Sequence, residues 1–291
     1  ILLTESGTQA LDLVCRLLLE PGDRVLVDDP CYFNFLALFR AHRVEAVGIP
    51  RTPAGPDLAA LEAALRAHRP RLYVTNAGPH NPTGGALSPV VCHRLLRLAE
   101  AHDLAIVEDE IFADFEDRPS PRLAAFAGLE RVVQIGSFSK TLSASARCGW
   151  IAARPGWIEA LVDLKLATAF GGGALSAEVV LHLLKEGAYR RHVQALRTRL
   201  AAARAAVGPR LDALGLRAGE APEAGLFLWR RLPAGVDGAA LARAAWASGV
   251  VLAPGDAFSV SRSCAGFMRF NVAQMQGPES FETLARLLPR A

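Results

Sequence analysis

The sequence predicts an α/β fold: a mostly parallel sheet sandwiched by helices, followed by a smaller C-terminal α+β domain. Three observations lead to this prediction. Short runs rich in Val, Ile and Leu alternate with segments of helical period from Ile1 to Ala153, which is typical of repeated β-α-β units with a buried sheet. Beyond residue 190 the pattern changes to a long Arg- and Ala-rich helix and then to mixed short strands and helices. Polar residues follow several of the apolar runs, at the edge where open α/β sheets bind ligands.

Apolar runs place the strands of the first part, and helical spacing places its helices. Strands are expected at Ile1–Thr4, Arg24–Val27, Val44–Ile49, Arg71–Thr75, Leu104–Val107, Val132–Ile135 and Cys148–Ala153. Helices are expected at Gln9–Glu20, Tyr32–His42, Leu58–Ala67 and Pro89–His102. Right-handed crossovers would place these helices on both faces of one sheet.

The second part is expected to begin with helices and to contain a small sheet. Helices are predicted at Ala177–Glu186, Tyr189–Leu214, Gly238–Ser248 and Glu279–Leu288, the second of them broken near Gly208-Pro209. Strands are predicted at Leu226–Arg230, Val250–Ala253 and Phe267–Asn271. We therefore divide the chain into a large domain, 1–190, and a part formed by the long linking helix and a small domain, 191–291. The chain starts without Met, inside an apolar run, so we expect a fragment whose large domain is incomplete at its N-terminus.

Composition excludes several classes of protein. The 291 residues are 51% hydrophobic and 21% charged, with a net charge of +3, which fits a globular protein and does not indicate a nucleic-acid or anionic-membrane partner. The five cysteines are scattered without a C-x-x-C pair, so we expect free thiols in a reducing cytoplasm. The sequence contains no signal peptide and no apolar run long enough to cross a bilayer.

The most informative motif is Gly136-Ser137-Phe138-Ser139-Lys140, directly after the expected strand Val132–Ile135. A lysine at the end of a buried strand lies at the rim of a cleft, where its charge is costly unless it has a chemical role. A carbonyl cofactor provides one, because the amine forms a Schiff base with it. The motif also fits the S-x-x-K of penicillin-recognising serine enzymes, but Lys140-Thr141-Leu142 is not their K-T-G element.

Several residues form a candidate phosphate site. Ser6, Gly7 and Thr8 follow the first strand and open a helix, whose N-terminal amides attract anions. Arg147 can add a bidentate grip, and Ser137 and Ser139 can add hydroxyl donors. The alternatives are an ordinary helix cap for Ser6-Gly7-Thr8 and a surface ion pair for Arg147.

The remaining candidates suit a flat, charged cofactor and an amino-acid substrate. Asp109 ends its strand between Glu108 and Glu110, and alternation directs it away from both neighbours. A buried carboxylate beside a pyridine nitrogen keeps that nitrogen protonated, and metal binding is disfavoured because no His or Cys lies at ligand spacing. Asn81 sits in a Pro- and Gly-rich loop and can donate to a phenolate oxygen, or form an ordinary turn. Tyr32 can stack on a ring, or belong to the core. Arg269, in an apolar strand, needs an anion, either a substrate carboxylate or an interdomain salt bridge.

Taken in order, these residues resemble the class I/II aminotransferases of the fold-type I pyridoxal-phosphate group. The resemblance spans essentially the whole chain and rests on Ser6-Gly7-Thr8, Tyr32, Asn81-Pro82-Thr83-Gly84, Asp109, Ser137-x-Ser139-Lys140, Arg147 and Arg269. More narrowly, the segments Val27–Phe35 and Ile135–Leu142 look like the aminotransferase-like half of MocR-type regulators of the GntR superfamily. In those regulators a winged-helix DNA-binding domain precedes the fold-type I domain.

The resemblance implies roles for each residue. Lys140 would carry pyridoxal 5′-phosphate as an aldimine and shuttle the α-proton, Asp109 would pair with the ring nitrogen, Asn81 would hold the ring oxygen, and Tyr32 would stack on the ring. Five residues would hold the phosphate: Gly7, Thr8, Ser137, Ser139 and Arg147. Arg269 would take the substrate carboxylate. The resemblance also implies a homodimer, since members of the family share active sites across the subunit interface.

One departure and one open choice follow. Phe112 stands three residues after Asp109, where the family usually has a tyrosine that bonds the ring oxygen, so the pKa of the Schiff base and the turnover are expected to differ. The first functional reading is amino-group transfer between an amino acid and a 2-oxo acid. The alternative is an effector-sensing domain of a MocR/GntR-type regulator that binds an amine with the same pocket. A decarboxylase or lyase on the same fold stays open, whereas a purely structural module leaves Lys140, Asp109 and Arg147 unexplained.

Overall fold

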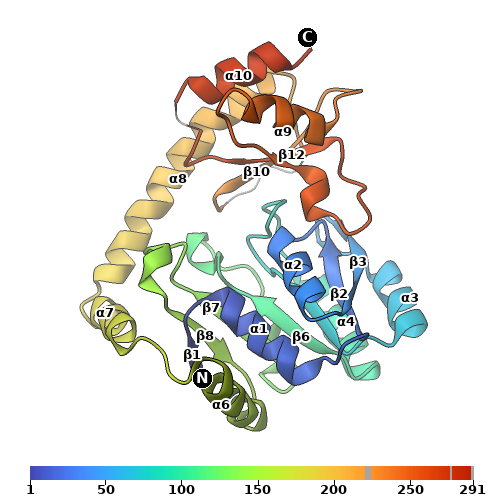
Figure 1. The fold of residues 1–291 in the computed structure, drawn as a ribbon, viewed down its shortest axis with the longest axis vertical. Coiled ribbons are helices and arrows are strands. Elements are labelled where there is room, and N and C mark those ends of the chain that lie inside the picture. The colour runs from blue at the N-terminus through green and yellow to red at the C-terminus, as the bar shows by residue number, and fades with distance from the viewer. Residues whose placement is uncertain (220–223, 276, 290–291) are drawn as a thin grey trace.

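The computed structural model describes residues 1–219, 224–275 and 277–289, which form two layered parts joined by one long helix (Figure 1). The strands are β1 Leu2–Thr4, β2 Arg24–Asp29, β3 Glu45–Thr52, β4 Gly55–Pro56, β5 Leu72–Thr75, β6 Ala105–Asp109, β7 Val132–Ser137, β8 Gly149–Ala152, β9 Arg217–Ala218, β10 Phe227–Arg231, β11 Ala253–Pro254 and β12 Phe267–Asn271. The helices are α1 Gly7–Leu18, α2 Phe33–Ala41, α3 Leu58–His68, α4 Pro89–Ala101, α5 Leu123–Ala127, α6 Pro155–Ala169, α7 Ala174–Lys185, α8 Ala188–Ala213, α9 Gly238–Trp246 and α10 Glu279–Leu287. Short 3₁₀ turns lie at η1 Ala113–Phe115, η2 Ala144–Ala146 and η3 Gly255–Phe258.

The large sheet confirms the predicted α/β class. Its strand order is β1-β8-β7-β6-β5-β2-β3-β4. The pairs from β7 through β6, β5 and β2 to β3 are parallel, while β8 runs antiparallel to both of its neighbours and β4 runs antiparallel to β3. The carboxyl ends of β2, β5, β6 and β7 therefore meet at one edge, as the sequence analysis requires for a shared site.

Helices cover both faces of this sheet. Helices α1, α2 and α6 pack on one face with Val107 and Ile135, and α3, α4 and α5 pack on the other with Ile106 and Val132. Neighbouring strand residues thus enter opposite cores, because side chains alternate along a strand. Burial of each such side chain contributes roughly 1.5–3 kcal/mol, so the sheet is a rigid base for the loops at its edge.

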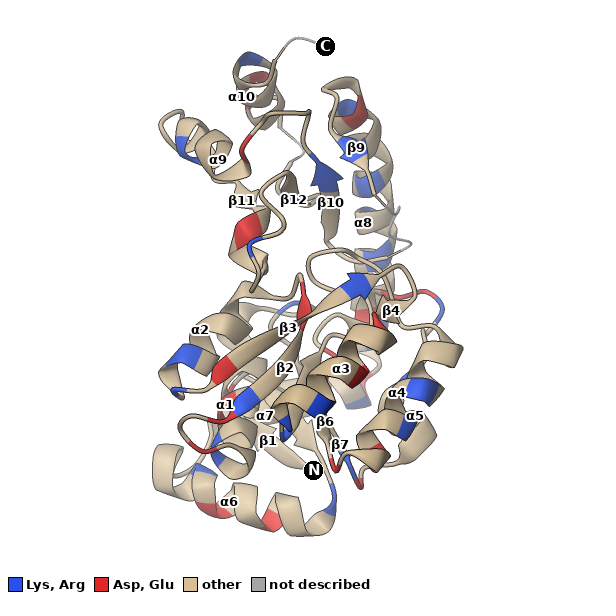
Figure 2. Ribbon diagram, turned by 90° about the vertical axis from the view of Figure 1, so that its right-hand side faces the viewer, with Lys and Arg blue, Asp and Glu red and all other residues tan. Residues whose placement is uncertain are grey.

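The small part holds an antiparallel sheet of order β11-β12-β10-β9. Its core combines this sheet with α8, α9 and α10, through side chains such as Leu211, Leu241 and Leu284. Helix α8 runs along one side of the molecule from α7 to the small sheet (Figure 1), and several Arg residues lie along it (Figure 2). Phe112 and Phe115 of the large part belong to the same core cluster as Leu200 of α8. This core therefore contains residues from both sides of the predicted domain boundary near residue 190, and that boundary stays a prediction.

Two details of the predicted elements were wrong, and helices α5 and α6 and the two-residue strands β4 and β9 were missed. Helix α8 continues through Gly208-Pro209, because Val207, Gly208 and Leu211 are buried and hold both sides of the proline in place. The strand expected at Val250–Ala253 is reduced to Ala253–Pro254, since only those residues pair with β12, and Val251 is exposed. Helix α6 has no counterpart among the predicted elements. Within the described residues, no helix has the length and apolar character needed to cross a membrane.

Candidate active site

A cleft of about 490 Å³ opens at the carboxyl edge of the large sheet and extends to the small sheet. Every site residue named in the sequence analysis lines it, except Ser137. A second cleft, of about 410 Å³, is lined by residues that flank the opposite ends of β5, β6 and β7, including Arg71, Asp103 and Arg131, and contains none of the predicted site residues. The chemistry predicted from the sequence therefore gathers in the first cleft.

One end of this cleft is suited to an anion. Ser6 caps α1 by accepting a hydrogen bond from the Gln9 amide at 3.1 Å. The amides of Gly7 and Thr8 have no hydrogen-bond partner among the described residues and belong to the cleft wall. Arg147 is exposed in the same wall and has no ion pair there within the described part of the chain. Free amides at a helix N-terminus and an unpaired guanidinium together form an anion site.

The two serines before Lys140 have different environments. Ser137 is buried, and its Oγ accepts from the Ser139 amide at 3.1 Å and lies 3.1 Å from the Cys148 carbonyl oxygen. Ser139 lines the cleft, with its Oγ 2.9 Å from that of Ser137. In the structure, Ser137 thus supports the turn that presents Ser139 and does not itself line the cleft.

Lys140 lies three residues beyond the end of β7, in the cleft wall. Its side chain is exposed and has no hydrogen-bond or ion-pair partner among the described residues. The next residue, Thr141, is 3% exposed. The Lys140 amine is thus unpaired, and the burial of Thr141 fixes the backbone directly after it.

Asp109 ends β6 and is almost fully buried at the base of the cleft. Its Oδ1 accepts a hydrogen bond from the Ile111 amide at 3.0 Å. Burial raises the pKa of Asp109 to about 6, although the Ile111 hydrogen bond and the charge of Lys140 oppose the rise. The ionised form of Asp109 is therefore unfavourable at the base of the cleft, and a cation bound beside it there would stabilise it.

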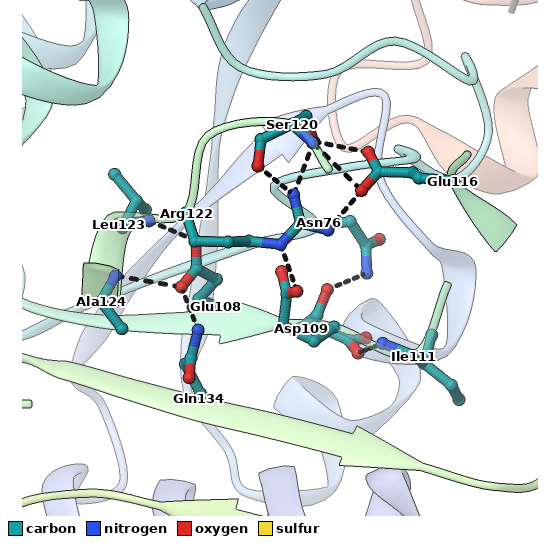
Figure 3. Close-up of polar contacts among 11 residues, drawn as sticks. Asn76, Glu108, Asp109, Ile111, Glu116, Ser120, Arg122, Leu123, Ala124 and Gln134 are labelled. Carbon is teal, nitrogen blue, oxygen red and sulfur yellow. Dashed lines mark hydrogen bonds and ion pairs between the residues drawn. The ribbon is translucent and has the colours of Figure 1, made fainter. Parts of the chain in front are cut away.

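Glu108 points away from Asp109, as strand alternation predicts (Figure 3), and Glu110 makes its ion pair with Arg122 outside the cleft. Glu108 accepts hydrogen bonds from the Leu123 and Ala124 amides, at 2.6 and 3.1 Å, and from Gln134 at 2.9 Å. Glu110 pairs with Arg122, which also bonds Glu116. Burial raises the pKa of Glu110 to about 8 despite the charge of Arg122. Only Asp109, of the three neighbouring acids, contributes to the cleft.

Arg269 on β12 and Asn81 in the loop after β5 come together across the cleft. Arg269 Nη1 donates to Asn81 Oδ1 at 2.8 Å, and the guanidinium lies over the rings of Phe227 at 4.0 Å and Phe258 at 4.6 Å. Burial lowers the pKa of Arg269 to about 10, and its Nε is buried without a hydrogen-bond partner among the described residues. Arg269 has no carboxylate partner there either, so its alternative role in an interdomain salt bridge finds no partner among the residues that the structure describes.

A buried polar network supports the loop that carries Asn81. Asp28 accepts hydrogen bonds from Arg51 at 3.0 Å, Thr75 at 2.6 Å and Tyr73 at 2.5 Å. His80 packs beside it, and burial lowers the pKa of His80 to about 4. His80 is therefore neutral near pH 7, and its Nδ1 lies 2.8 Å from Thr83 Oγ1 in the loop that carries Asn81. The sequence analysis considered His80 only as part of that loop.

Aromatic side chains complete the wall. Tyr32 lines the cleft and contacts the rings of Phe33 and Phe35 at 4.8 and 5.4 Å between centroids. Phe112 also lines it, 5.6 Å from Phe227, so the position of the family's usual tyrosine has no hydroxyl. The sequence analysis missed Phe227 and also missed Asn76, whose Nδ2 lies 3.4 Å from the Asp109 carbonyl oxygen. Asn76 directly follows β5, so the rule that polar residues after strands form the site applies to it too.

A family model described as aminotransferase class I and II matches residues 1–287. The chain belongs to the class I and II aminotransferases. It is 30% identical to aromatic-amino-acid aminotransferase 1 of Thermococcus litoralis over 99% of this chain and 71% of that protein. It is 31% identical to 2-aminoadipate transaminase of Thermus thermophilus over 99% of this chain and 74% of that one. The HTH-type transcriptional regulator YdcR of Escherichia coli is 28% identical over 99% of this chain and 62% of its own length.

Solved structures show the same fold. A crystal structure of LysN, an α-aminoadipate aminotransferase from Thermus thermophilus, superposes with a TM-score of 0.89 at 31% identity and covers 98% of this chain and 75% of that one. A kynurenine aminotransferase from Pyrococcus horikoshii gives a TM-score of 0.90 at 28% identity, over 99% and 73%. This aminotransferase thus has the fold of the fold-type I pyridoxal-phosphate enzymes. Its chemistry is amino-group transfer between an amino acid and a 2-oxo acid, as the resemblance implied.

Proposed function

We propose that the cleft binds pyridoxal 5′-phosphate covalently at Lys140 and performs amino-group transfer there. The observation that carries the proposal is that a free lysine amine, a buried carboxyl and an unpaired anion site lie in the walls of one cleft. A neighbouring solved structure, LysN, contains N-(5′-phosphopyridoxyl)-L-leucine, which supports a cofactor of this type.

The residues of this chain fit the cofactor at three points. The free amides of Gly7 and Thr8, together with Ser139 and Arg147, match a phosphate. Asp109 matches a ring nitrogen that carries a proton, because a cation relieves the cost of its buried charge. Tyr32 offers an aromatic ring in the cleft wall, and Asn81 has an amide nitrogen that can donate to the ring oxygen.

When bound, pyridoxal phosphate supplies an aldehyde that combines with amines and a ring that withdraws electrons from the substrate carbon. Lys140 Nζ would hold the cofactor and, once the substrate amine has replaced it there, would accept and return the proton at the substrate α-carbon as a free amine. Asp109 keeps the ring nitrogen protonated. Arg269, half-buried and without an anionic partner among the described residues, would bind the substrate α-carboxylate. Ser6 caps the helix whose N-terminus faces the phosphate, and Ser137 supports Ser139.

We also propose a homodimer that works in the cytoplasm. The exposed apolar residues Leu166, Leu175, Val179 and Leu184 lie on α6 and α7, and an apolar surface of this kind supports an interface with a second copy. All five cysteines are buried and free, which supports a reducing compartment.

The second candidate is an effector-sensing domain of a MocR/GntR-type regulator. This chain is similar to the regulator YdcR and aligns with 62% of the length of YdcR, which favours the sensing function. Both functions use one pocket, so turnover separates them. An enzyme converts many equivalents of amino acid when a 2-oxo acid is supplied, whereas a sensor binds or converts about one equivalent per site.

The test of the cofactor assignment is chemical labelling of the lysine. Purified protein incubated with pyridoxal phosphate should develop visible absorbance, and borohydride reduction should attach the label to the peptide that contains Lys140. Lys140→Ala should lose both signals, whereas Lys165→Ala, which removes a lysine from α6, should lose neither. A label on another peptide, or a colourless wild-type protein in excess cofactor, contradicts the proposal.

A further inference from the structure

The first turns of α8 contact the two loops that carry the central site residues. One loop, 138–142, contains Lys140, and the other, 110–116, follows Asp109. Tyr189, His192 and Arg197 of α8 make these contacts. The same helix then enters the core of the small domain through Leu200, and β12 of that domain carries Arg269.

Tyr189 joins the two loops through a single hydroxyl. Its oxygen bonds the Asp114 carboxylate and lies 2.9 Å from Thr141 Oγ1. A phenol has one proton, so the hydroxyl donates to Asp114 and accepts from Thr141. Burial, followed by the Asp114 hydrogen bond, raises the pKa of Tyr189 above its usual range, which keeps that proton in place. The Tyr189 ring also packs edge-on against Phe138, with centroids 5.4 Å apart.

His192 and Arg197 extend these contacts. The Thr141 carbonyl oxygen lies 2.7 Å from His192 Nε2, and a carbonyl only accepts, so Nε2 carries the proton. Arg197 Nε donates to the Asp114 carbonyl oxygen at 2.7 Å. On the other side of the lysine, the Phe138 amide bonds the Cys148 carbonyl at 3.0 Å. Hydrogen bonds therefore hold the segment 138–142 on both sides of Lys140, whereas the Lys140 side chain itself has no hydrogen-bond partner among the described residues.

We propose that Tyr189 and His192 are positioning residues that hold the Lys140 segment in register with the segment after Asp109. Lys140 lies in one of these loops and Asp109 directly precedes the other, and Tyr189 is bonded to both loops. Its hydrogen bonds therefore help to set the distance between the Lys140 amine and a ring nitrogen bound at Asp109. Because α8 also belongs to the small-domain core, the same contacts link the position of Lys140 to the domain that carries Arg269. This inference rests on the proposed function, which assigns Lys140 and Asp109 to one cofactor.

Two measurements on Tyr189→Phe test the proposal, since this substitution keeps the ring and removes the hydroxyl. In the cofactor-free protein, amide hydrogen exchange within 138–142 should become about tenfold faster, as a hydrogen bond to a buried group is lost. In the loaded protein, the Kd for pyridoxal phosphate should rise about tenfold, and the pH midpoint of the visible absorbance should shift. His192→Ala should change the same quantities in the same direction, and His192→Gln, which retains a donor, should restore them in part.

Tyr73→Phe is the matched control, because it removes a phenol that bonds a different carboxylate, Asp28, at 2.5 Å. It should leave exchange within 138–142 at the wild-type value, since its bond lies in the network under the Asn81 loop. Faster exchange in Tyr189→Phe with an unchanged Kd and midpoint would make the contact structural only and overturn the proposal. Equal effects of the two tyrosine substitutions on exchange within 138–142 would overturn it too. A wild-type protein that stays colourless refutes the proposed function itself, and it is recognised before any variant is compared.

Discussion

Asp109 shows how the position of one carboxyl group on a strand determines its chemistry. Its neighbours Glu108 and Glu110 lie outside the cleft and are compensated there by amides and by Arg122. Asp109 has no such guanidinium, and burial raises its pKa to about 6. An uncompensated carboxylate is costly for the protein alone and useful for a protonated ring, because a cation lowers that cost.

Asp109→Asn should therefore stabilise the cofactor-free protein in a pH-dependent way. A pKa raised from 3.8 to about 6 on folding means that the folded chain binds the proton more tightly, so this carboxyl lowers stability as pH rises from 4 to 6. A shift of this size corresponds to roughly 3 kcal/mol. In urea denaturation without cofactor, the variant should exceed the wild type by about 1–3 kcal/mol at pH 7.5.

At pH 4 the wild type and Asp109→Asn should unfold at similar urea concentrations, since the wild-type carboxyl is then largely protonated in the folded state. A stability difference that is the same at both pH values would contradict this account. The same variant should bind pyridoxal phosphate more weakly at pH 7.5, although its cofactor-free form is the more stable one.

The segment between β6 and α5 depends on one arginine. Arg122 bonds both Glu110 and Glu116 and also donates to the Ser120 carbonyl at 2.8 Å (Figure 3). This links the two ends of the segment that contains Phe112, a residue of the cleft wall. The side chains of Arg122, Glu110 and Glu116 are 14%, 7% and 6% exposed, so water screens their charges only weakly.

Arg122→Met should destabilise the protein by about 3–5 kcal/mol, because it leaves the buried Glu116 carboxylate without its counter-charge and removes the donor that bonds the buried Glu110. Arg131→Met is the matched control. Its ion pair with Asp103 at 2.6 Å is exposed, and loss of such a pair costs about 0–1 kcal/mol. Urea denaturation of both variants at pH 7.5 checks the difference. Similar losses in the two variants would show that the segment does not depend on the Arg122 network.

At the scale of the whole molecule, the cleft lies between two layered parts whose sheets are built differently. The large sheet supplies the cofactor side, and β10 and β12 of the small sheet supply Phe227 and Arg269. Outside the cleft, α6 and α7 expose a run of apolar residues, among them Leu175 at 79% and Val179 at 51%. We expect a second copy of the chain to cover this surface.

The double variant Leu175→Asp, Val179→Asp should convert a dimer into monomers, because two carboxylates cannot be buried at the interface without partners. Sedimentation velocity at micromolar concentration measures the outcome. The control is Val90→Asp on α4, which introduces the same charge at a residue that is 67% exposed. A wild-type protein that sediments as a monomer, or a variant that remains dimeric, contradicts the assignment of this surface.

The sequence by itself determined the fold class and the place of the site. Apolar runs separated by helical segments require a buried parallel sheet, and the carboxyl ends of parallel strands share one edge. Asp109 ends a strand, and Lys140 and Asn81 each lie in a loop after a strand, so their meeting at one edge could be predicted without coordinates. Their motif also predicted the family, which the comparisons confirmed.

Only the tertiary structure decided which of these groups are paired and which are free. Contacts between residues far apart in sequence, such as Arg269 with Asn81 and Tyr189 with Thr141, leave no periodic pattern in the chain. Local packing also decides that Ser137 is buried while Ser139 lines the cleft. It decides likewise that α8 continues through Pro209. Pairing and burial set the charge of a side chain, and both depend on neighbours that the chain brings together only when it folds.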